Sequence, residues 1–419
     1  MSGINLSRDV LTMILAGGQG QRLYPLTKHR SKPAVPFGGI YRIIDFTLSN
    51  CINSKLFRIF LLTQYKSYSL EKHINLGWSY LFRSELSEFI YTVPPQQRLA
   101  DNWYTGTADA IFQNIYLLEM IRPKYLLILS GDHIYKMNYA RLLDFHVDTG
   151  SDLTIACQRV PLNEARKFGV MSIDGDKRVI SFKEKPQNPD PLPDDSSSCL
   201  CNMGIYVFNT DFLVKTLGRD AKAESAHDFG KNIIPSVIPT ARVRAYEFLD
   251  ENRKNVQYWR DIGTLDSYYE TSMDLVGVDP LFNLYDYDWP IRTFQRQLPP
   301  AKTVFGSGNY PEIPERSGIV MDSVISGGVI ISGARVENSI LSPRVRVNSY
   351  AYVKDSIIMN DCIIGRNAVV RNAIIDKEVI IPEGHKIGLD LENDRKFFTV
   401  TDNGIVIIPK KSPFLKEMK

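Results

Sequence analysis

Pairs of aliphatic residues recur about every six residues along the last hundred residues of the chain. Small or polar residues separate the pairs, and a glycine follows the aliphatic position at Gly365 and Gly388. A repeat of this length lets each short strand place its aliphatic side chain in one stacked interior column. The spacing therefore predicts a parallel β-helix over residues 316–419. An ordinary β-sandwich is the alternative, but a sandwich does not require such regular spacing.

The chain up to about residue 280 has a different pattern, in which apolar strand-like runs alternate with amphipathic segments. This alternation predicts an α/β domain with a mostly parallel sheet, whose ligands bind beyond the carboxyl ends of the strands. The strand-like runs are 10–16, 57–63, 125–130, 153–157 and 204–208, and the helix-like segments include 108–121 and 139–149.

A chain of 419 residues is too long for one ordinary core, so two domains are expected. Residues 283–315 are rich in aromatic residues and prolines without a clear period, and we interpret them as a connector. The expected organisation is therefore a catalytic domain over 1–282, a connector over 283–315 and a β-helix domain over 316–419.

Charge and cysteine usage narrow the function further. Lys and Arg total 50 against 47 for Asp and Glu, which gives no reason to expect a nucleic-acid partner. No run approaches the roughly 18 apolar residues of a membrane span, and the N-terminus lacks the apolar core of a signal peptide. The five cysteines have no metal-ligand spacing, so we expect reduced thiols in a cytoplasmic protein.

A glycine-rich loop follows the first apolar run. At Gly17 and Gly18 no Cβ stops the backbone N–H groups from approaching a phosphate, and Arg22 and Lys32 add two cations. The loop is neither a dinucleotide-binding fingerprint nor a P-loop. It predicts a phosphate-rich ligand; a plain turn from strand to loop is the alternative, although such a turn needs neither cation.

Two acidic residues stand where α/β folds place their sites. Asp132 comes just after the run 125–130, and Asp261 ends the aromatic-rich run that begins at Tyr258. Carboxylate oxygens are the ligands that a magnesium ion bridging phosphates requires, so both residues are candidate metal ligands. The alternative for each is an aspartate that caps a helix or a turn.

Further polar residues are candidates for binding a sugar phosphate. Thr107, after the turn at Gly106, is expected to cap a helix and to leave free amides near a ligand. Lys185 suits a sugar phosphate and Glu184 suits sugar hydroxyls, although Lys-Glu-Lys is also typical of a solvated charged face. His227 has no accompanying nucleophile motif, so we interpret it as structural or as positioning the substrate.

Together these segments resemble the glucose-1-phosphate adenylyltransferase family along nearly the whole chain. The glycine loop and FKEKP are common to sugar nucleotidyltransferases, whereas NWYTGTADA, HDFGK and WPIRT are more particular to members that make ADP-glucose. The six-residue repeat is similar to the C-terminal domain of this family. The resemblance implies a nucleotidyltransferase domain with a mostly parallel sheet followed by a left-handed parallel β-helix.

The reaction implied by the resemblance joins ATP and α-D-glucose 1-phosphate to give ADP-glucose and pyrophosphate, for glycogen or another α-glucan. It is an in-line attack of the sugar phosphate oxygen on the α-phosphorus of ATP. Such a reaction needs cations and backbone N–H groups rather than a nucleophilic side chain. The resemblance also implies Mg²⁺ as the cofactor and a cytoplasmic homotetramer.

Site roles follow from the same resemblance. Gly17 and Gly18 line the triphosphate, Arg22 stabilises the departing pyrophosphate, and Lys32 supports the charged phosphates. Asp132 and Asp261 hold magnesium. The residues implied for glucose 1-phosphate are Tyr104, Gly106, Gly169, Glu184, Lys185 and Asn202, with Lys185 on its phosphate, and either Gln96 or Gln97 is implied to read the adenine.

The chain departs from the pattern of many bacterial members at four positions. Asn202 replaces a common serine of the sugar site. At positions associated with the anionic allosteric effector, a frequent Lys is His29, a frequent His is Pro36 and a frequent Arg is Met120. Arg42 is retained, and Lys377 stands near a frequent Arg. We therefore expect intact catalysis with weakened or altered activation by sugar phosphates.

Three alternatives remain open from the sequence. The first is a pyrophosphorylase that uses UTP, dTTP or GTP. The second is a non-catalytic regulatory subunit, which loss of Arg22, Lys32 or Asp132 would indicate, but all three are present. The third is an acyltransferase built on the β-helix, for which His385 is the available catalytic histidine.

Overall fold

The computed structural model describes residues 4–96, 103–192, 194–254, 257–304 and 317–412. Its internal contacts divide the chain into two compact units, and each is described by itself. Unit 1 comprises Met1–Gly18, Thr47–Gly131 and Lys136–Arg253. Unit 2 comprises Gln19–Phe46, Asp132–Tyr135 and Lys254–Lys419.

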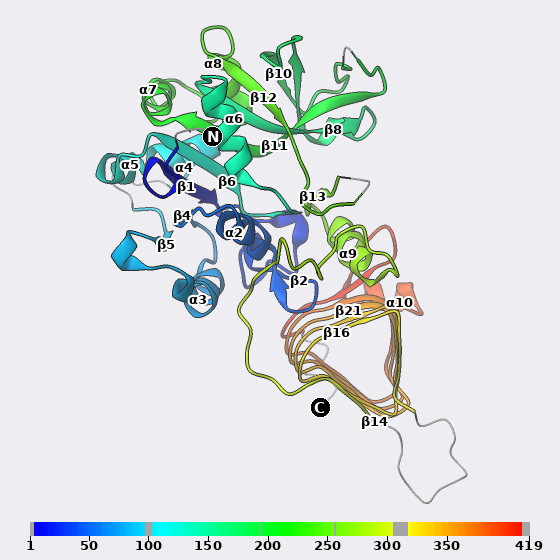
Figure 1. Ribbon diagram of the computed structural model, residues 1–419. Coiled ribbons are helices and arrows are strands. Elements are labelled where there is room, and N and C mark those ends of the chain that lie inside the picture. Colours follow the sequence, from blue (N-terminus) through cyan, green and yellow to red (C-terminus); the bar gives the residue numbers. More distant parts are fainter. Residues whose placement is uncertain (1–3, 97–102, 193, 255–256, 305–316, 413–419) are drawn as a thin grey trace, which may run out of the picture. The chain divides into compact units, whose positions relative to one another are not determined.

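Unit 1 is built on a nine-stranded mixed sheet (Figure 1). Strands β5, β4, β1 and β6 are mutually parallel neighbours, whereas β11 runs antiparallel to β6, β8 and β9. The predicted α/β sheet is confirmed. Its strands are Val10–Leu15 (β1), Arg58–Leu62 (β4), Phe89–Val93 (β5), Tyr125–Ser130 (β6), Leu153–Pro161 (β8), Gly169–Ile173 (β9), Val179–Glu184 (β10), Ser198–Asn209 (β11) and Val243–Glu247 (β12).

Short helices accompany this sheet. The helix expected over 108–121 is two helices, because the Asn114 side chain donates to the Ala110 carbonyl at 2.8 Å and competes with the helical backbone. The helices are Leu6–Asp9 (α1), Ile43–Asn53 (α2, which begins in unit 2), Tyr68–Gly77 (α3), Thr107–Phe112 (α4), Ile115–Ile121 (α5), Tyr139–Asp148 (α6), Thr210–Asp220 (α7) and Ile234–Val237 (α8). The short turns are Ser79–Leu81 (η3), Ser84–Leu86 (η4), Ala165–Lys167 (η5) and the π-helical Phe229–Ile233 (η6).

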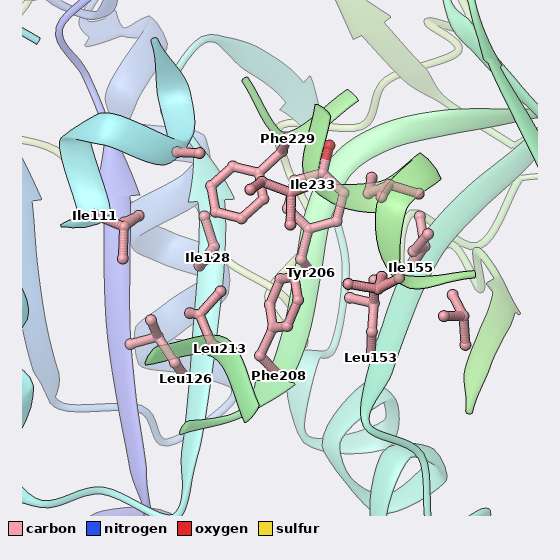
Figure 2. Packing of buried hydrophobic residues seen from close by; sticks show 14 of the residues in the cluster. Ile111, Leu126, Ile128, Leu153, Ile155, Tyr206, Phe208, Leu213, Phe229 and Ile233 are labelled. Carbon is pink, nitrogen blue, oxygen red and sulfur yellow. The ribbon is translucent and has the colours of Figure 1, made fainter. Parts of the chain in front are cut away.

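One hydrophobic cluster fills the space between the sheet and α4, α7 and η6. Figure 2 shows Ile128 and Phe208, from β6 and β11, directed toward Ile111, Leu213 and Phe229 of these helices. Burying a side chain of this size is worth about 2 kcal/mol. The alternating apolar runs of the sequence thus become the buried face of the sheet.

A buried histidine makes the stability of unit 1 depend on pH. The His146 nitrogens lie 2.8 Å from Thr154 Oγ1 and 3.3 Å from Asn209 Oδ1, and burial lowers the pKa of His146 to about 4. The unfolded chain takes up this proton near pH 6.5, so its stabilising contribution is present above pH 6.5 and lost as the pH falls through 4. We expect the free energy of unfolding to drop by about 2 kcal/mol between pH 7 and 5.

Denaturant titrations at the two pH values measure this loss. The His146→Gln variant is the control, because it lacks the titrating group and its unfolding should respond less to the same pH change. An equal pH response in both proteins would contradict the assignment.

Unit 2 contains a parallel coil of short strands, which Figure 1 shows in yellow to red as a three-sided stack. Successive rungs pair 17 residues apart, as from Val347 to Ile364 and from Ile364 to Ile381, and these side chains form one buried column. The predicted parallel β-helix is confirmed, while its handedness stays a prediction.

The coil includes strand β14, which pairs with β17 although it lies within the predicted connector 283–315. The domain boundaries drawn from the sequence remain a prediction. The strands of the coil are Lys302–Val304 (β14), Ile319–Met321 (β15), Val324–Ile325 (β16), Ile330–Ser332 (β17), Arg335–Glu337 (β18), Ile340–Leu341 (β19), Arg346–Val347 (β20), Tyr352–Ile358 (β21), Ile363–Ile364 (β22), Val369–Ile375 (β23), Ile380–Ile381 (β24), Lys386–Ile387 (β25), Thr399–Val400 (β26) and Val406–Ile408 (β27).

The rest of unit 2 packs on this coil. An apolar cluster joins Val35 and Phe37 to Ile357 and Ile374 of the coil. The remaining elements are the turns Gln21–Leu23 (η1), Lys32–Ala34 (η2) and Asp274–Val276 (η7), the strands Pro36–Phe37 (β2), Tyr41–Arg42 (β3), His133–Tyr135 (β7) and Trp259–Asp261 (β13), and the helices Leu265–Met273 (α9) and Leu391–Arg395 (α10).

A buried ion pair reinforces this packing. One guanidinium nitrogen of Arg30, Nη2, donates to both carboxylate oxygens of Asp376 at 2.8 and 3.0 Å, and the two side chains are 4% and 2% exposed. The pair connects the segment that carries Lys32 to the coil. Removal of either partner would be costly, because it would leave a buried charge uncompensated.

Two predictions about the whole chain can also be compared with the structure. Helices in the described part of the chain reach 11 residues at α2 and α7, and none has the length and apolar character needed to cross a membrane. All five cysteines are buried and free.

Candidate functional site

Two carboxylates and a lysine meet in unit 2. Strand β7 pairs antiparallel with β13 so that Asp261 lies opposite His133, which brings Asp132 close to Asp261. The Lys32 ammonium lies 2.6 Å from Asp132 Oδ2 and 3.1 Å from Asp261 Oδ1. The structure thus joins three residues that the sequence singled out from separate motifs.

His133 belongs to the same cluster. Its Nε2 lies 3.5 Å from Asp132 Oδ1 and 3.8 Å from Asp261 Oδ1, and its ring packs edge-on against Trp259. The other ring nitrogen, Nδ1, is buried without a hydrogen-bond partner among the described residues. Sequence reasoning missed His133, although its position directly after Asp132 was a signal that could have identified it.

The cluster has the chemistry of a metal site. One ligand atom from each of Asp132, His133 and Asp261 lies within 4.8 Å of the others. The two carboxylates are partly open, with 25% and 28% of their side chains exposed. Hard oxygen donors that remain accessible fit magnesium, so these residues could hold the ion implied by the sequence.

Electrostatics keep Lys32 in its charged form. Burial by itself lowers the pKa of this lysine, but the charges of Asp132 and Asp261 outweigh burial and raise its pKa above the usual value. Gly20 is required beside it, because Gly20 has φ +62° and a Cβ there would lie 2.9 Å from Lys32 Cβ. The close approach of these two backbone segments therefore depends on a glycine.

Arg22 is placed beside the same carboxylates. It lies in η1 and is exposed. A Cβ at Gly263 would lie 3.3 Å from Arg22 Nη2 and 3.4 Å from Asp261 Oδ2, so this glycine leaves room for the guanidinium next to Asp261. Arg22 and Lys32 thus bring two positive charges to the cluster.

The glycine loop and the predicted adenine reader begin in unit 1. A Cβ at Gly17 would lie 3.0 Å from Gln64 Cβ, whereas Gly18 is exposed with open space around it. Gln96 is exposed, and its amide donates to the carbonyl of Pro94 at 2.9 Å. Gln97 lies outside the described residues.

A second cluster in unit 1 surrounds Glu184 at the end of β10. A Cβ at Gly230 would lie 2.7 Å from Glu184 Oε2, and one at Gly169 would lie 2.9 Å from the same oxygen. Burial raises the pKa of the Glu184 carboxyl. Lys185 is 62% exposed, and its ammonium lies 3.7 Å from Glu184 Oε1. Gly169 and Gly230 thus leave space around Glu184 Oε2, next to the exposed ammonium of Lys185.

Tyr104 and Asn202 are held by neighbouring side chains in unit 1. The Asn202 side chain donates to the Tyr206 hydroxyl at 2.7 Å and accepts from the Gly204 amide at 2.9 Å. The Tyr104 hydroxyl accepts from Asn114 at 2.9 Å, and burial raises its pKa. Both side chains are therefore oriented by hydrogen bonds within the protein.

The prediction that Thr107 caps helix α4 is wrong. The N-cap residue is Gly106, and the amides of Ala108 and Asp109 donate to the His227 carbonyl at 2.8 and 3.3 Å. His227 has φ +49°, which the sequence did not reveal, and its carbonyl takes the place expected for a ligand. A Cβ at Gly106 would lie 2.2 Å from that carbonyl oxygen, so the packing of the His227 carbonyl against the helix requires a glycine at this position.

The Thr107 side chain instead joins two segments of unit 1. Its hydroxyl donates to Asp228 Oδ2 at 3.0 Å and accepts from the Phe229 amide at 3.0 Å. Asp228 also accepts from the amides of Gly230 and Lys231. Asp228 therefore fixes the turn that carries Gly230, a role that sequence reasoning missed.

Most of the predicted effector positions lie in unit 2, whereas Met120 lies in unit 1. Burial, together with the charges of Arg42 and Arg30, lowers the pKa of Lys377 to about 7, and burial lowers that of Arg42 to about 10. Partial burial and nearby lysines lower the pKa of His29, which is exposed. Arg30 Nη1 is buried without a hydrogen-bond partner among the described residues. In this part of unit 2, Arg30, Arg42 and Lys377 lie close enough for their charges to affect one another.

Comparisons with known proteins identify the family of the chain. The nucleotidyl transferase family model matches residues 11–277, and the model for the GlmU-like C-terminal hexapeptide matches residues 299–408. A glucose-1-phosphate adenylyltransferase from Rhodopirellula baltica is 56% identical over 407 residues, which is 97% of this chain and 91% of the relative. Those from Koribacter versatilis and Methylococcus capsulatus are each 51% identical over 96% of this chain, and the match covers 95% and 94% of these relatives.

Proposed function

This chain belongs to the glucose-1-phosphate adenylyltransferase family, and we propose that it transfers the adenylyl group of ATP to α-D-glucose 1-phosphate, forming ADP-glucose for glycogen synthesis and releasing pyrophosphate. The observation that carries this proposal is the meeting of Lys32, Asp132 and Asp261 within hydrogen-bond distance. Such a cluster supplies a cation and metal-binding carboxylates, which a reaction between two phosphates requires.

We propose roles at the nucleotide phosphates for four charged residues of unit 2. In the reaction an oxygen of the sugar phosphate attacks the α-phosphorus, and the bond to pyrophosphate breaks. We assign Lys32 and Arg22 to the negative charge that develops there, because preorganised cations stabilise such charge. Asp132 and Asp261 would hold magnesium, which when bound neutralises phosphate charge and orients the triphosphate.

We propose roles at the sugar, and at part of the nucleotide, for residues of unit 1. Glu184 has an acceptor oxygen suited to sugar hydroxyls, and the exposed ammonium of Lys185 suits the sugar phosphate. We assign Gly17 and Gly18 to the triphosphate, because Gly18 has open space around it. The remaining sugar contacts that we propose are Tyr104, Gly106, Gly169 and Asn202, and Gln96 or Gln97 is proposed to read adenine.

Pyrophosphate release measured with ATP, UTP, dTTP and GTP, each with glucose 1-phosphate, tests the proposal. We expect ATP to give the highest kcat/KM. A preference for UTP would replace the proposed nucleotide and keep the reaction class. The absence of release with every nucleotide would favour the regulatory-subunit alternative. We further propose a homotetramer, which light scattering coupled to gel filtration tests.

Activation by sugar phosphates is expected to be weakened or altered, because the resemblance implies other effector-site residues at the positions of His29, Pro36 and Met120. We expect fructose 1,6-bisphosphate to change the rate by less than about fivefold, the lower end of usual allosteric couplings. Lys377 carries its charge below pH 7 and loses it above, so any effect should be larger at pH 6.5 than at pH 8. A large activation at both pH values would contradict this expectation.

A further inference from the structure

We propose that Lys32 is a tethered cation that occupies the metal site of the free enzyme, and that a divalent ion enters by displacing its ammonium from the two carboxylates. The displaced ammonium is then available to the substrate phosphates. This inference deepens the proposed function, because it describes how the same cluster passes from its free to its loaded state.

The contacts of Lys32 are those of a bridging cation. Its ammonium donates to one oxygen of Asp132, at 2.6 Å, and to one oxygen of Asp261, at 3.1 Å. Both distances are close to those of charge-assisted hydrogen bonds. A magnesium ion shared by the two aspartates would use an oxygen of each residue in the same way. Lys32 and the ion therefore compete for the same pair of carboxylates.

Charge makes this competition strong. The two carboxylates carry two negative charges, and Lys32 already compensates one of them. A divalent ion that joined the same oxygens while the ammonium stayed would place like charges within a few ångström in a partly buried site. Repulsion at that distance weakens binding by at least about tenfold, so loading favours departure of the ammonium.

The chain allows the ammonium to move while the backbone stays. Lys32, Pro33 and Ala34 form a buried turn, and Lys32 Cβ is close to the position where a Cβ at Gly20 would lie. These contacts fix the backbone at Lys32. The four-carbon stem beyond Cβ has several rotatable bonds, so rotation of the side chain alone can carry the ammonium away from the carboxylates.

The His133 ring lies beside both carboxylates. Its Nε2 lies 3.5 Å from Asp132 Oδ1, the oxygen that Lys32 does not use. The same nitrogen lies 3.8 Å from Asp261 Oδ1. The two aspartates therefore retain a shared neighbour when the ammonium leaves.

Manganese binding to the free enzyme tests the proposal. Electron paramagnetic resonance measures free Mn²⁺ in titrations of the wild-type chain and of Lys32→Met, without nucleotide or sugar. We expect Lys32→Met to bind Mn²⁺ at least about tenfold more tightly, although its adenylyl transfer falls. Lys183→Met, which removes a lysine paired with Asp190 in unit 1, is the matched control and should leave Mn²⁺ affinity unchanged.

Equal or weaker Mn²⁺ binding by Lys32→Met would overturn the proposal. A second measurement on the wild-type chain is independent of whether that variant folds. Acetylation of Lys32 by an amine-selective ester, followed by mass spectrometry, should become faster when Mn²⁺ is added. An unchanged or slower reaction would also overturn the exchange. Both readouts omit the substrates, so a wrong nucleotide or sugar in the proposed function would leave them unaffected.

Discussion

Replacement of Asp132 by Asn is expected to lower kcat for pyrophosphate release by about 10³-fold, which corresponds to about 4 kcal/mol of transition-state stabilisation. The substitution keeps the size of the side chain but removes a charged ligand from the cluster with Asp261 and His133. It also removes one of the two carboxylates that Lys32 contacts. Steady-state kinetics with saturating ATP, glucose 1-phosphate and Mg²⁺ measure the loss.

Asp174→Asn is the matched control for this experiment. Asp174 accepts from the backbone amides of Asp176 and Arg178 in an exposed turn, and an asparagine oxygen can accept the same bonds. Its activity should equal that of the wild-type chain. If Asp132→Asn retained activity within about tenfold of wild type, Asp132 would lose its metal-binding role.

Substitution of Gly230 by Ala is expected to lower kcat/KM for glucose 1-phosphate by about 10²-fold, because displacing a substrate-binding group by about 1 Å can cost that much. The new methyl group would lie 2.7 Å from Glu184 Oε2 and 3.4 Å from Asp228 Oδ1, so the Glu184 carboxylate has to move. The KM for ATP should change little, since the assigned contacts of Glu184 are with the sugar.

Gly218→Ala separates this effect from the general cost of replacing a glycine. Gly218 lies inside helix α7, and a Cβ there meets nothing within 4 Å. Alanine at this position should leave the kinetics unchanged and favour the helix slightly. A Gly230→Ala enzyme with normal kcat/KM for glucose 1-phosphate would show that Glu184 does not hold the sugar.

Periodicity alone predicted much of the fold. The run 125–130 coincides with β6, and the aliphatic pair at 363–364 coincides with β22 of the coil. Both follow from local burial patterns, which a sequence displays directly. The break between α4 and α5 was not predictable in this way, because it depends on where the Asn114 side chain finds an acceptor.

The candidate site was predicted less completely, because its contacts join distant segments. Asp132 and Asp261 were recognised one at a time, but the register of β7 on β13, which makes them neighbours, is a property of tertiary structure. Capping of α4 by the His227 carbonyl likewise depends on the positive φ of His227, which cannot be predicted from the residue type. Contacts with backbone groups of distant segments cannot be predicted from a local sequence pattern.

The packing of Val35 and Phe37 against Ile357 and Ile374 restricts how this gene could be cut and recombined. A fragment that ends before the coil would leave those aromatic and aliphatic surfaces in water, together with an Arg30 deprived of its carboxylate. A chimera that takes its coil from a distant homologue would need matching substitutions in the segment around Lys32. The coil and the segment that carries Lys32 therefore depend on each other and would have to be exchanged together.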